Sequence, residues 1–291
     1  MKLHDHTGRD IILYASNWTK PISSRGAESI NEEDMQGLME AIHRLNLGKL
    51  DLILHSPGGV AEVTESMVSY LRKKFDHIRV IVPQAAMSAA TMLACAANEI
   101  VMGKQSSLGP IDPQLGLLHE YGVQFLPAQA IIDNFETAKK ISSESPQQMG
   151  AFLPILGQYS PGLIEQCYEA QALSVELVSK WLRLYMFKDR EDSAVEAKRV
   201  AERLANHSKF KSHTRHIDMD KARKLGLKVT PLEADQTLQD LVLSVFHATT
   251  IVFDRPVIKI IENHLGSAFI KHQPSLPPPP LSILSPPNAG S

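Results

Sequence analysis

Two short segments of the chain carry residues whose types and spacing suit nucleophilic catalysis. The first is Ser56-Pro57-Gly58-Gly59, which follows one apolar run and precedes an amphipathic one. Proline fixes φ, and the two glycines let the backbone turn with no side chain covering their N–H groups. Free amides at the mouth of a sheet can hydrogen-bond a developing oxyanion. The alternative is an ordinary tight turn between a strand and a helix.

The second segment places a serine among small residues. Ser88 lies within the sequence AAMSAAT at residues 85–91, again directly after an apolar run. Small neighbours allow a peptide carbonyl to approach the hydroxyl closely, and a helix beginning here favours negative charge at its first turn. The alternative is a helix of small residues packed against a sheet, in which Ser88 only fills space.

Apolar runs alternate with helical periodicity through the first half of the chain. Strand-like runs are Asp10–Ala15, Leu50–His55, Ile78–Val82 and Ile100–Met102, and helical stripes cover 35–45, 60–71 and 87–96. Asn31 can cap the first helix and Gly48 can end it. Such alternation predicts an α/β fold with a parallel sheet. Both chemical segments then follow neighbouring strands, at the carboxyl edge where open α/β sheets build their sites.

The second half of the chain is predicted to be mainly helical. Its expected elements are a long helix over 163–184, a helix from Asp218 to Leu225 ended by Gly226, a strand at 227–229, a helix over 238–245 and a last strand over 256–262. From residue 273 to 291 the sequence is proline-rich, which favours polyproline II and a solvated tail. A partner that reads proline-rich segments is the alternative. The domain is therefore expected to span residues 1–272.

The motifs HSPGG and AMSAATMLACAANEIVMGKQSSLGPIDPQL resemble the Clp protease/crotonase superfamily, and within it the serine dehydrogenase proteinase family most closely. The resemblance runs from about Thr7 to Ile270. It implies Ser88 as the nucleophile and the glycine pair as the oxyanion turn, with amides drawn from Gly58, Gly59 and Ala89. No GxGxxG motif follows a strand, so the family name does not imply nicotinamide binding, and we expect no cofactor.

A nucleophilic serine needs a base and a group that orients that base. Where Clp proteases carry their histidine, this sequence has Asp112. The serine dehydrogenase proteinase family orders its triad as Ser, Asp, His, which makes Asp112 the orienting carboxylate and His213 the base, with His216 as its rival. These histidines could instead be surface residues of a polar loop. Together with His207 they fit no common zinc spacing, and we expect no metal.

Signal peptide peptidase A proteins, which share the resemblance, pair serine with lysine. Lys139 and Lys140 occupy the corresponding region, and a desolvated lysine there could act as the base. The polar residues that follow argue for a solvated pair instead.

Composition narrows the class of protein. The 291 residues are 43% hydrophobic and 21% charged, with a formal net charge of -2, which is typical of a globular protein without general affinity for nucleic acid. Cys95 and Cys167 show no CxxC spacing and read as buried free thiols. No signal peptide or membrane span is expected, so we expect a cytoplasmic protein.

Three candidate functions are consistent with these residues and this resemblance. The first is a serine peptidase acting on protein or peptide substrates, and the resemblance also implies a homo-oligomer. The second is a catalytically inactive scaffold or binding protein with the same fold, because fold alone does not fix function. The third, a crotonase-like acyl-CoA enzyme, is weaker because those enzymes do not need a serine here and no CoA-phosphate cluster is evident.

Overall fold

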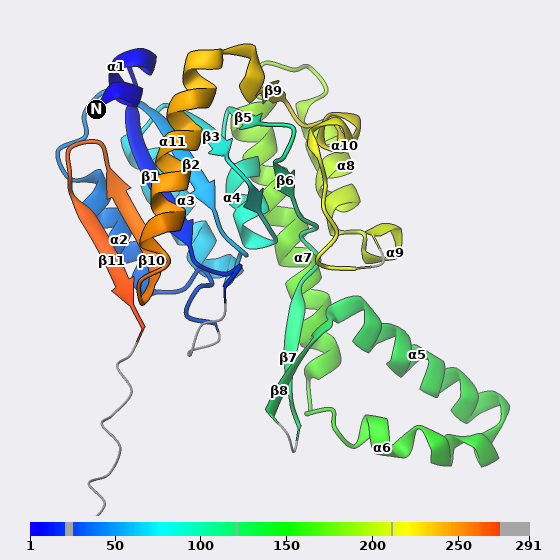
Figure 1. Ribbon diagram of the computed structural model, residues 1–291. Coiled ribbons are helices and arrows are strands. Elements are labelled where there is room, and N and C mark those ends of the chain that lie inside the picture. Colours follow the sequence, from blue (N-terminus) through cyan, green and yellow to red (C-terminus); the bar gives the residue numbers. More distant parts are fainter. Residues whose placement is uncertain (21–25, 120–121, 211, 274–291) are drawn as a thin grey trace, which may run out of the picture.

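The computed structural model describes residues 1–20, 26–119, 122–210 and 212–273, and a seven-stranded sheet lies at its centre (Figure 1). The sheet order is β11-β10-β1-β2-β3-β5-β9. Its strands are β1 (Asp10–Ser16), β2 (Lys49–His55), β3 (His77–Val82), β5 (Glu99–Met102), β9 (Val229–Pro231), β10 (Val257–Asn263) and β11 (Ala268–His272). The first five are mutually parallel, and β10 and β11 extend the sheet antiparallel. The predicted α/β fold with a mostly parallel sheet is confirmed.

Helices cover both faces of this sheet. They are α1 (Lys2–Thr7), α2 (Glu33–Ile42), α3 (Ala61–Lys74), α4 (Ala89–Cys95), α5 (Ala128–Glu144), α6 (Leu153–Leu156), α7 (Leu163–Trp181), α8 (Ser193–Ala205), α9 (His207–Phe210), α10 (Met219–Leu225) and α11 (Gln236–Val252), with short turns η1 (Pro146–Ala151), η2 (Leu182–Met186) and η3 (Leu232–Ala234). Side chains of α1 and α11 pack on one face. Those of α2, α3, α4, α7, α8 and α10 pack on the other.

The parallel strands are apolar on both faces because each face is covered. In β1, Ile12 and Tyr14 belong to one buried cluster, whereas Ile11 and Leu13 belong to the other. Strands buried on two sides read as continuous apolar runs without alternation. This is why the sequence shows the central strands so clearly.

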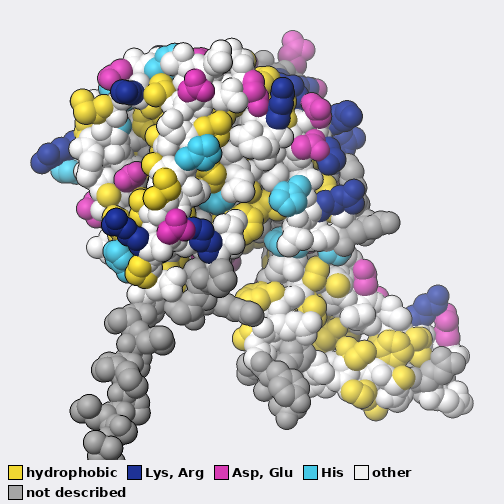
Figure 2. Space-filling view, in the orientation of Figure 1, with side chains coloured by type: hydrophobic (Ala, Val, Ile, Leu, Met, Phe, Trp, Pro, Cys, Tyr) yellow, Lys and Arg dark blue, Asp and Glu magenta, His cyan; other side chains and the backbone are white. Residues whose placement is uncertain are grey.

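An arm projects from the body of the molecule (Figure 1). It consists of the hairpin β7 (Gln114–His119) and β8 (Gly122–Pro127), the helices α5 and α6, and the start of α7. A separate small core that includes Leu117, Ile131 and Cys167 holds it together. The sequence analysis did not predict this hairpin. Figure 2 shows apolar side chains exposed along the arm.

Several predicted boundaries were wrong, and each has a local cause. Helix α2 ends at Ile42, not at Gly48, whose positive φ of 68° instead forms the turn into β2. Strand β9 begins at Val229 because 227–228 still belongs to the turn after α10. The α10 ends were predicted correctly, since Asp218 accepts from the backbone of Lys221 and Gly226 adopts φ 113°.

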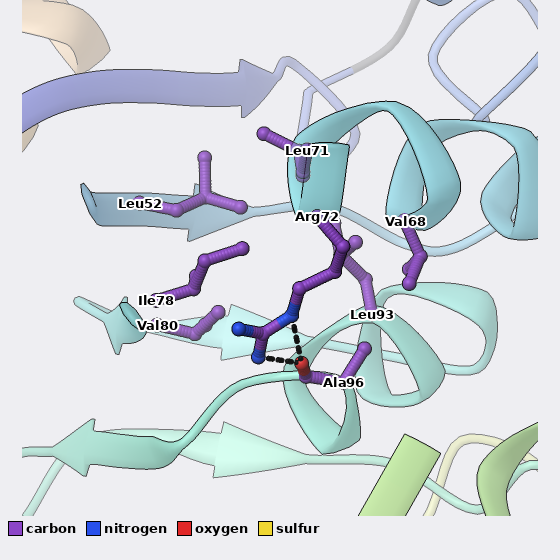
Figure 3. Close-up of a pocket in the computed structure, with 8 residues that line it drawn as sticks. All are labelled: Leu52, Val68, Leu71, Arg72, Ile78, Val80, Leu93 and Ala96. Carbon is purple, nitrogen blue, oxygen red and sulfur yellow. Dashed lines mark hydrogen bonds between the residues drawn. The ribbon is translucent and has the colours of Figure 1, made fainter. Parts of the chain in front are cut away.

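Helix α4, which follows Ser88, is fixed at its far end by a half-buried arginine. Arg72 of α3 donates through Nε to the carbonyl of Ala96 at 3.2 Å, and Figure 3 shows its guanidinium among apolar side chains of the sheet and α4. Burial lowers the pKa of Arg72 to about 10. A cation at a helix C-terminus also complements its dipole. The cavity around the Arg72 side chain has a volume of about 10 Å³, which is too small for a ligand. The residues that line it therefore hold α4 in place and do not form a binding site.

Three further expectations concern thiols, membrane spans and the tail. Cys95 and Cys167 are free and buried, as predicted, and burial raises the pKa of Cys95 to about 12. Among the described helices, none combines the length and hydropathy that a bilayer span requires. The proline-rich tail beyond Gln273 lies outside the described residues.

Candidate active site

The two chemical segments meet at the carboxyl edge of the sheet, after the neighbouring strands β2 and β3. A parallel bridge joins them directly. The Ser56 amide donates to Ala85 at 3.1 Å, and the Met87 amide donates back to Ser56 at 3.0 Å. The predicted adjacency of the glycine turn and the serine is therefore present in the fold.

Ser88 has a backbone conformation that side-chain-bearing residues rarely adopt. Its φ is 49° and its ψ is -120°, and the side chain is half-buried. Residues held in such regions cost about 1–3 kcal/mol and cluster at functional sites, where a sharp strand-to-helix turn exposes a nucleophile. No described residue forms a hydrogen bond with the Ser88 hydroxyl, so its oxygen is free to react.

Gly58 lies against the backbone that carries the serine. A Cβ at Gly58 would stand 2.5 Å from the Met87 carbonyl, 2.7 Å from Ser88 Cβ and 2.8 Å from the Ala89 nitrogen. Only glycine fits at this distance, and its φ of 97° also favours glycine. The glycine turn and the first amide of α4 therefore line the same small space.

The peptide between Gly58 and Gly59 is oriented by its neighbour Ile30. The Ile30 amide donates to the Gly58 carbonyl at 2.7 Å, and the Val60 amide donates to the Ile30 carbonyl at 3.0 Å. In a planar trans peptide the carbonyl and the N–H point in opposite directions. The Gly59 N–H is thus directed away from Ile30.

The three predicted oxyanion donors are not equivalent. The Gly58 amide already donates to Ser56 Oγ at 3.2 Å. The amides of Gly59 and Ala89 have no acceptor among the described residues. These two N–H groups are the ones available to a ligand oxygen.

Asp112 receives hydrogen bonds from two histidines. Its carboxylate, 3% exposed, lies 2.9 Å from His213 Nδ1 and 2.8 Å from His207 Nδ1. Figure 2 shows histidine side chains at the surface where the body meets the arm. The rival His216 does not reach Asp112, because its Nδ1 bonds to Ser107 Oγ at 2.7 Å. Each Nδ1 that donates to Asp112 leaves the Nε2 of the same ring with a lone pair.

Short strands position Asp112 relative to the serine. Strand β6 (Ser107–Leu108) pairs with β4 (Ala85–Ala86), which ends two residues before Ser88. On its other side Leu108 exchanges two backbone hydrogen bonds with Ile217. The ladder thus connects the serine turn, the Asp112 segment and the histidine segment.

Thr91 strengthens this connection from inside α4. Its hydroxyl donates to the Ala86 carbonyl at 2.7 Å and accepts from the Gly109 amide at 2.9 Å. The loop that leads to Asp112 is thereby tied to the helix that begins after Ser88. Neither His207 nor His213 forms a hydrogen bond with Ser88 Oγ here. Catalytic hydrogen bonds are often long in apo enzymes and shorten with substrate.

The lysines of the alternative mechanism lie elsewhere. Lys139 and Lys140 are exposed on α5 of the arm, and Lys139 lies 3.6 Å from Glu136. A base of the serine–lysine type needs a desolvated amine with a lowered pKa. The described chain gives these two side chains no such burial.

One group in the described residues has metal-ligand composition. His4, Asp10 and His264 place ligand atoms within 4.8 Å of one another. The two rings, however, are stacked 4.1 Å apart and nearly parallel, so their in-plane lone pairs do not converge on one ion. His264 Nδ1 also accepts from the Ile11 amide, which leaves its Nε2 protonated when the ring is neutral. This arrangement is that of a stacked pair and not of a preformed metal site.

Sequence reasoning missed His207 as a partner of Asp112. The sequence offered no signal for it, because the approach of α9 to Asp112 depends on the Ile111 amide bonding to the Leu204 carbonyl. Buried polar groups beside the turn were missed as well. His55 Nδ1 and Trp18 Nε1 are buried without hydrogen-bond partners among the residues that the structure describes. Burial lowers the pKa of His55 to about 4, so this ring is neutral at pH 7.

Comparisons with known proteins identify a family and several similar chains. The family of ClpP-like SDH-type serine proteinases matches residues 28–242. Two uncharacterized proteins of Methanocaldococcus jannaschii are similar: MJ1495 is 36% identical over 119 residues, and MJ0137 is 41% identical over 88 residues. These matches cover 40% and 30% of this chain, and only 38% and 31% of the relatives' own lengths. A mutant of the membrane-bound stomatin-specific protease 1510-N is a distant structural neighbour, with a TM-score of 0.39, 16% identity and coverage of 69% of this chain and 74% of that one.

Proposed function

From the fact that the chain belongs to the ClpP-like SDH-type serine proteinase family, we propose that it hydrolyses peptide bonds with Ser88 as nucleophile. The observation that carries the proposal is the strained Ser88 packed against Gly58, with the amides of Gly59 and Ala89 lacking an acceptor among the described residues. A half-buried hydroxyl with free N–H groups at its side is the arrangement that acyl transfer requires. Its substrates would be proteins or peptides.

The first half of the reaction forms an acyl-enzyme. Ser88 Oγ bonds to the substrate carbonyl carbon, and the hydroxyl proton passes to Nε2 of His213. The N–H groups of Gly59 and Ala89 hydrogen-bond the resulting oxyanion. When the tetrahedral intermediate collapses, the C–N bond breaks and the imidazolium returns the proton to the leaving amine.

The second half releases the acyl group. A water molecule gives a proton to His213 while its oxygen bonds to the acyl carbon, and collapse returns that proton to Ser88 as its ester bond breaks. Asp112 keeps the His213 Nδ1 protonated and stabilises the charged ring, supported by their 2.9 Å contact. His213 is preferred over His207 because its segment continues into the Ile217–Leu108 bridge that leads to Ser88.

A fluorophosphonate probe tests this function directly. We expect the wild-type protein to be labelled and the adduct to map to Ser88 by mass spectrometry. Ser88→Ala should abolish labelling and lower peptide hydrolysis by about three to six orders of magnitude. Ser244→Ala is the matched control, because that serine is exposed on α11 and bonds only to the carbonyl of Asp240.

Two results would contradict the peptidase proposal. Undiminished labelling of the Ser88→Ala protein would remove Ser88 as the nucleophile. A folded wild-type protein that is neither labelled nor able to cleave peptides would favour the inactive scaffold, for which the supporting observation is that no basic side chain of the described residues hydrogen-bonds the Ser88 hydroxyl. Circular dichroism of each variant keeps loss of activity separate from loss of fold.

We also propose that the arm mediates association with further copies of the chain. Val123, Phe125, Leu153 and Ile155 are 41–68% exposed on the hairpin and around α6. Exposed apolar side chains gathered in one region are typical of interaction surfaces. Light scattering measures the assembly, and a monomer at micromolar concentration would contradict it.

A further inference from the structure

A fully buried ion pair lies behind the oxyanion turn. Lys259 of β10 and Asp34 of α2 are both 0% exposed, and Lys259 Nζ lies 2.6 and 2.8 Å from the two carboxylate oxygens. The Tyr14 hydroxyl also donates to Asp34 at 2.7 Å. Burial lowers the pKa of Lys259, and the nearby carboxylate opposes that shift.

Such a pair is costly to bury, so its other contacts indicate what it does. Desolvation of two charges often exceeds their attraction, and apolar residues of similar volume can be as stable. Here both side chains also bind backbone next to the turn. Lys259 Nζ donates to the Ser29 carbonyl at 2.8 Å, and Asp34 Oδ2 accepts from the Asn31 amide at 2.9 Å.

The residue between these two anchors is Ile30. Its amide donates to the Gly58 carbonyl, which orients the Gly58–Gly59 peptide, and its carbonyl accepts from the Val60 amide on the other side of Gly59. Packing leaves no slack, because a Cβ at Gly59 would stand 2.3 Å from the Ile30 carbonyl oxygen and 2.4 Å from its nitrogen. A displacement of the 29–31 segment must therefore move the glycine turn.

We propose that Lys259 and Asp34 are positioning residues for the oxyanion hole, which act by clamping Ser29–Asn31 and, through Ile30, the Gly59 amide. The inference rests on the proposed function for its catalytic meaning. The ion pair touches neither Ser88 nor the substrate. Its role is to keep one N–H donor aimed at the position of the oxyanion.

The test replaces both charges together, because removing one would leave the other buried and unpaired. The variant Lys259→Met with Asp34→Asn keeps the volume of both side chains and loses the Ser29 contact. Its control is Arg79→Met with Asp51→Asn at a second ion pair, in which Asp51 is 0% exposed and Arg79 Nη2 lies 2.6 Å away. That pair lies at the opposite edge of the sheet. Arg9, the other partner of Asp51, keeps its hydrogen bonds to the carbonyls of Leu50 and His77 in this control.

The first readout is the fluorophosphonate reaction, separated into its binding constant and its maximal labelling rate. For the Lys259/Asp34 variant we expect the maximal rate to fall about 10- to 100-fold with the binding constant unchanged, since misplacing one oxyanion donor affects the reacting state. The control should lose thermal stability but label at the wild-type rate. Equal maximal rates in the two double variants would overturn the inference.

The second readout does not depend on catalysis. Hydrogen–deuterium exchange of the peptide covering 56–60 should become at least about tenfold faster in the Lys259/Asp34 variant and stay unchanged in the control. Unchanged exchange overturns the inference even if the wild-type protein proves inactive, in which case only the proposed function fails. If the double variant does not fold, Tyr14→Phe, which removes one hydrogen bond to Asp34 but keeps the ion pair, should change both readouts in the same direction by a smaller factor, and wild-type values would overturn the clamp.

Discussion

The two ends of the parallel strands, here called the amino edge and the carboxyl edge of the sheet, differ in how their polar groups are paired. At the amino edge, the buried Asp51 accepts hydrogen bonds from Arg9 and Arg79, and Arg9 also donates to the carbonyls of Leu50 and His77. At the carboxyl edge, Ser88 holds a strained backbone, while the amides of Gly59 and Ala89 have no protein acceptor among the described residues.

The charged groups that stabilise the fold thus lie at the amino edge, and the groups suited to a reaction lie at the carboxyl edge. At the amino edge every named charge has a partner, which avoids the penalty of several kcal/mol for an unpaired buried ion. The carboxyl edge leaves donors open and tolerates backbone strain, which folding alone does not favour. We infer that substitutions at the amino edge mainly change stability, whereas those at the carboxyl edge mainly change activity.

After Ser88→Ala, the largest effect is expected at His213. His213→Ala should lower the rate of peptide hydrolysis by about 10³- to 10⁴-fold, because the proposed base is lost while the oxyanion hole remains. Thermal unfolding should change little, since this ring is partly exposed. Steady-state kinetics on a fluorogenic peptide measures the loss.

Two other histidines sharpen that result. His216→Ala should stay within a few-fold of wild type, because its ring bonds to Ser107 and not to Asp112. His207→Ala tests the second ring on the carboxylate. If His207→Ala abolishes hydrolysis and His213→Ala does not, the base has been assigned to the wrong histidine.

The next effect compares two glycines of positive φ at opposite edges. Gly59→Ala should reduce labelling of Ser88 by about 10²- to 10³-fold, because the added Cβ meets the Ile30 backbone and displaces an oxyanion donor. Gly48→Ala meets only Asp76 Oδ2, at 3.5 Å. Its left-handed backbone should cost about 1–2 kcal/mol of stability without affecting labelling. Similar labelling rates for the two variants would contradict the assignment of Gly59.

The smallest effect concerns the pH dependence of stability. The pKa of His55 is about 4 in the folded protein and near 6.5 in the unfolded chain, so the unfolded state binds more protons between these values. The stabilising contribution is complete above pH 6.5 and is lost as the pH falls through this window, by about 3 kcal/mol at pH 4.

A substitution isolates that contribution. The free energy of unfolding, measured by chemical denaturation, should fall less between pH 7 and pH 5 in His55→Phe than in the wild type. His77→Gln is the amino-edge comparison, because burial also lowers the pKa of His77, but that ring is only partly buried. An acid sensitivity in His55→Phe as large as in the wild type would show that other groups carry it.

Much of the fold could be predicted from the sequence because the central strands are buried on both sides. Uninterrupted apolar runs such as Ile11–Ala15 fit best in the middle of a covered sheet. The arm could not be predicted in this way. Strand β8 of its hairpin is largely exposed, with Phe125 68% accessible, so no alternating burial pattern is imprinted on that strand.

The candidate site likewise has one part that the sequence predicted and another that depends on tertiary contacts. The sequence alone determined the glycine turn, because the positive φ of Gly58 and Gly59 is a property of single residues, and it marked Ser88 by the small residues around it. Only the tertiary structure decided that His207 shares Asp112, that His216 does not, and that Lys259 and Asp34 lie behind Ile30. These contacts join residues about a hundred or more positions apart, and no local pattern records such a distance. Long-range partners are selected by packing of whole elements, whereas turns are selected by the conformational limits of single residues.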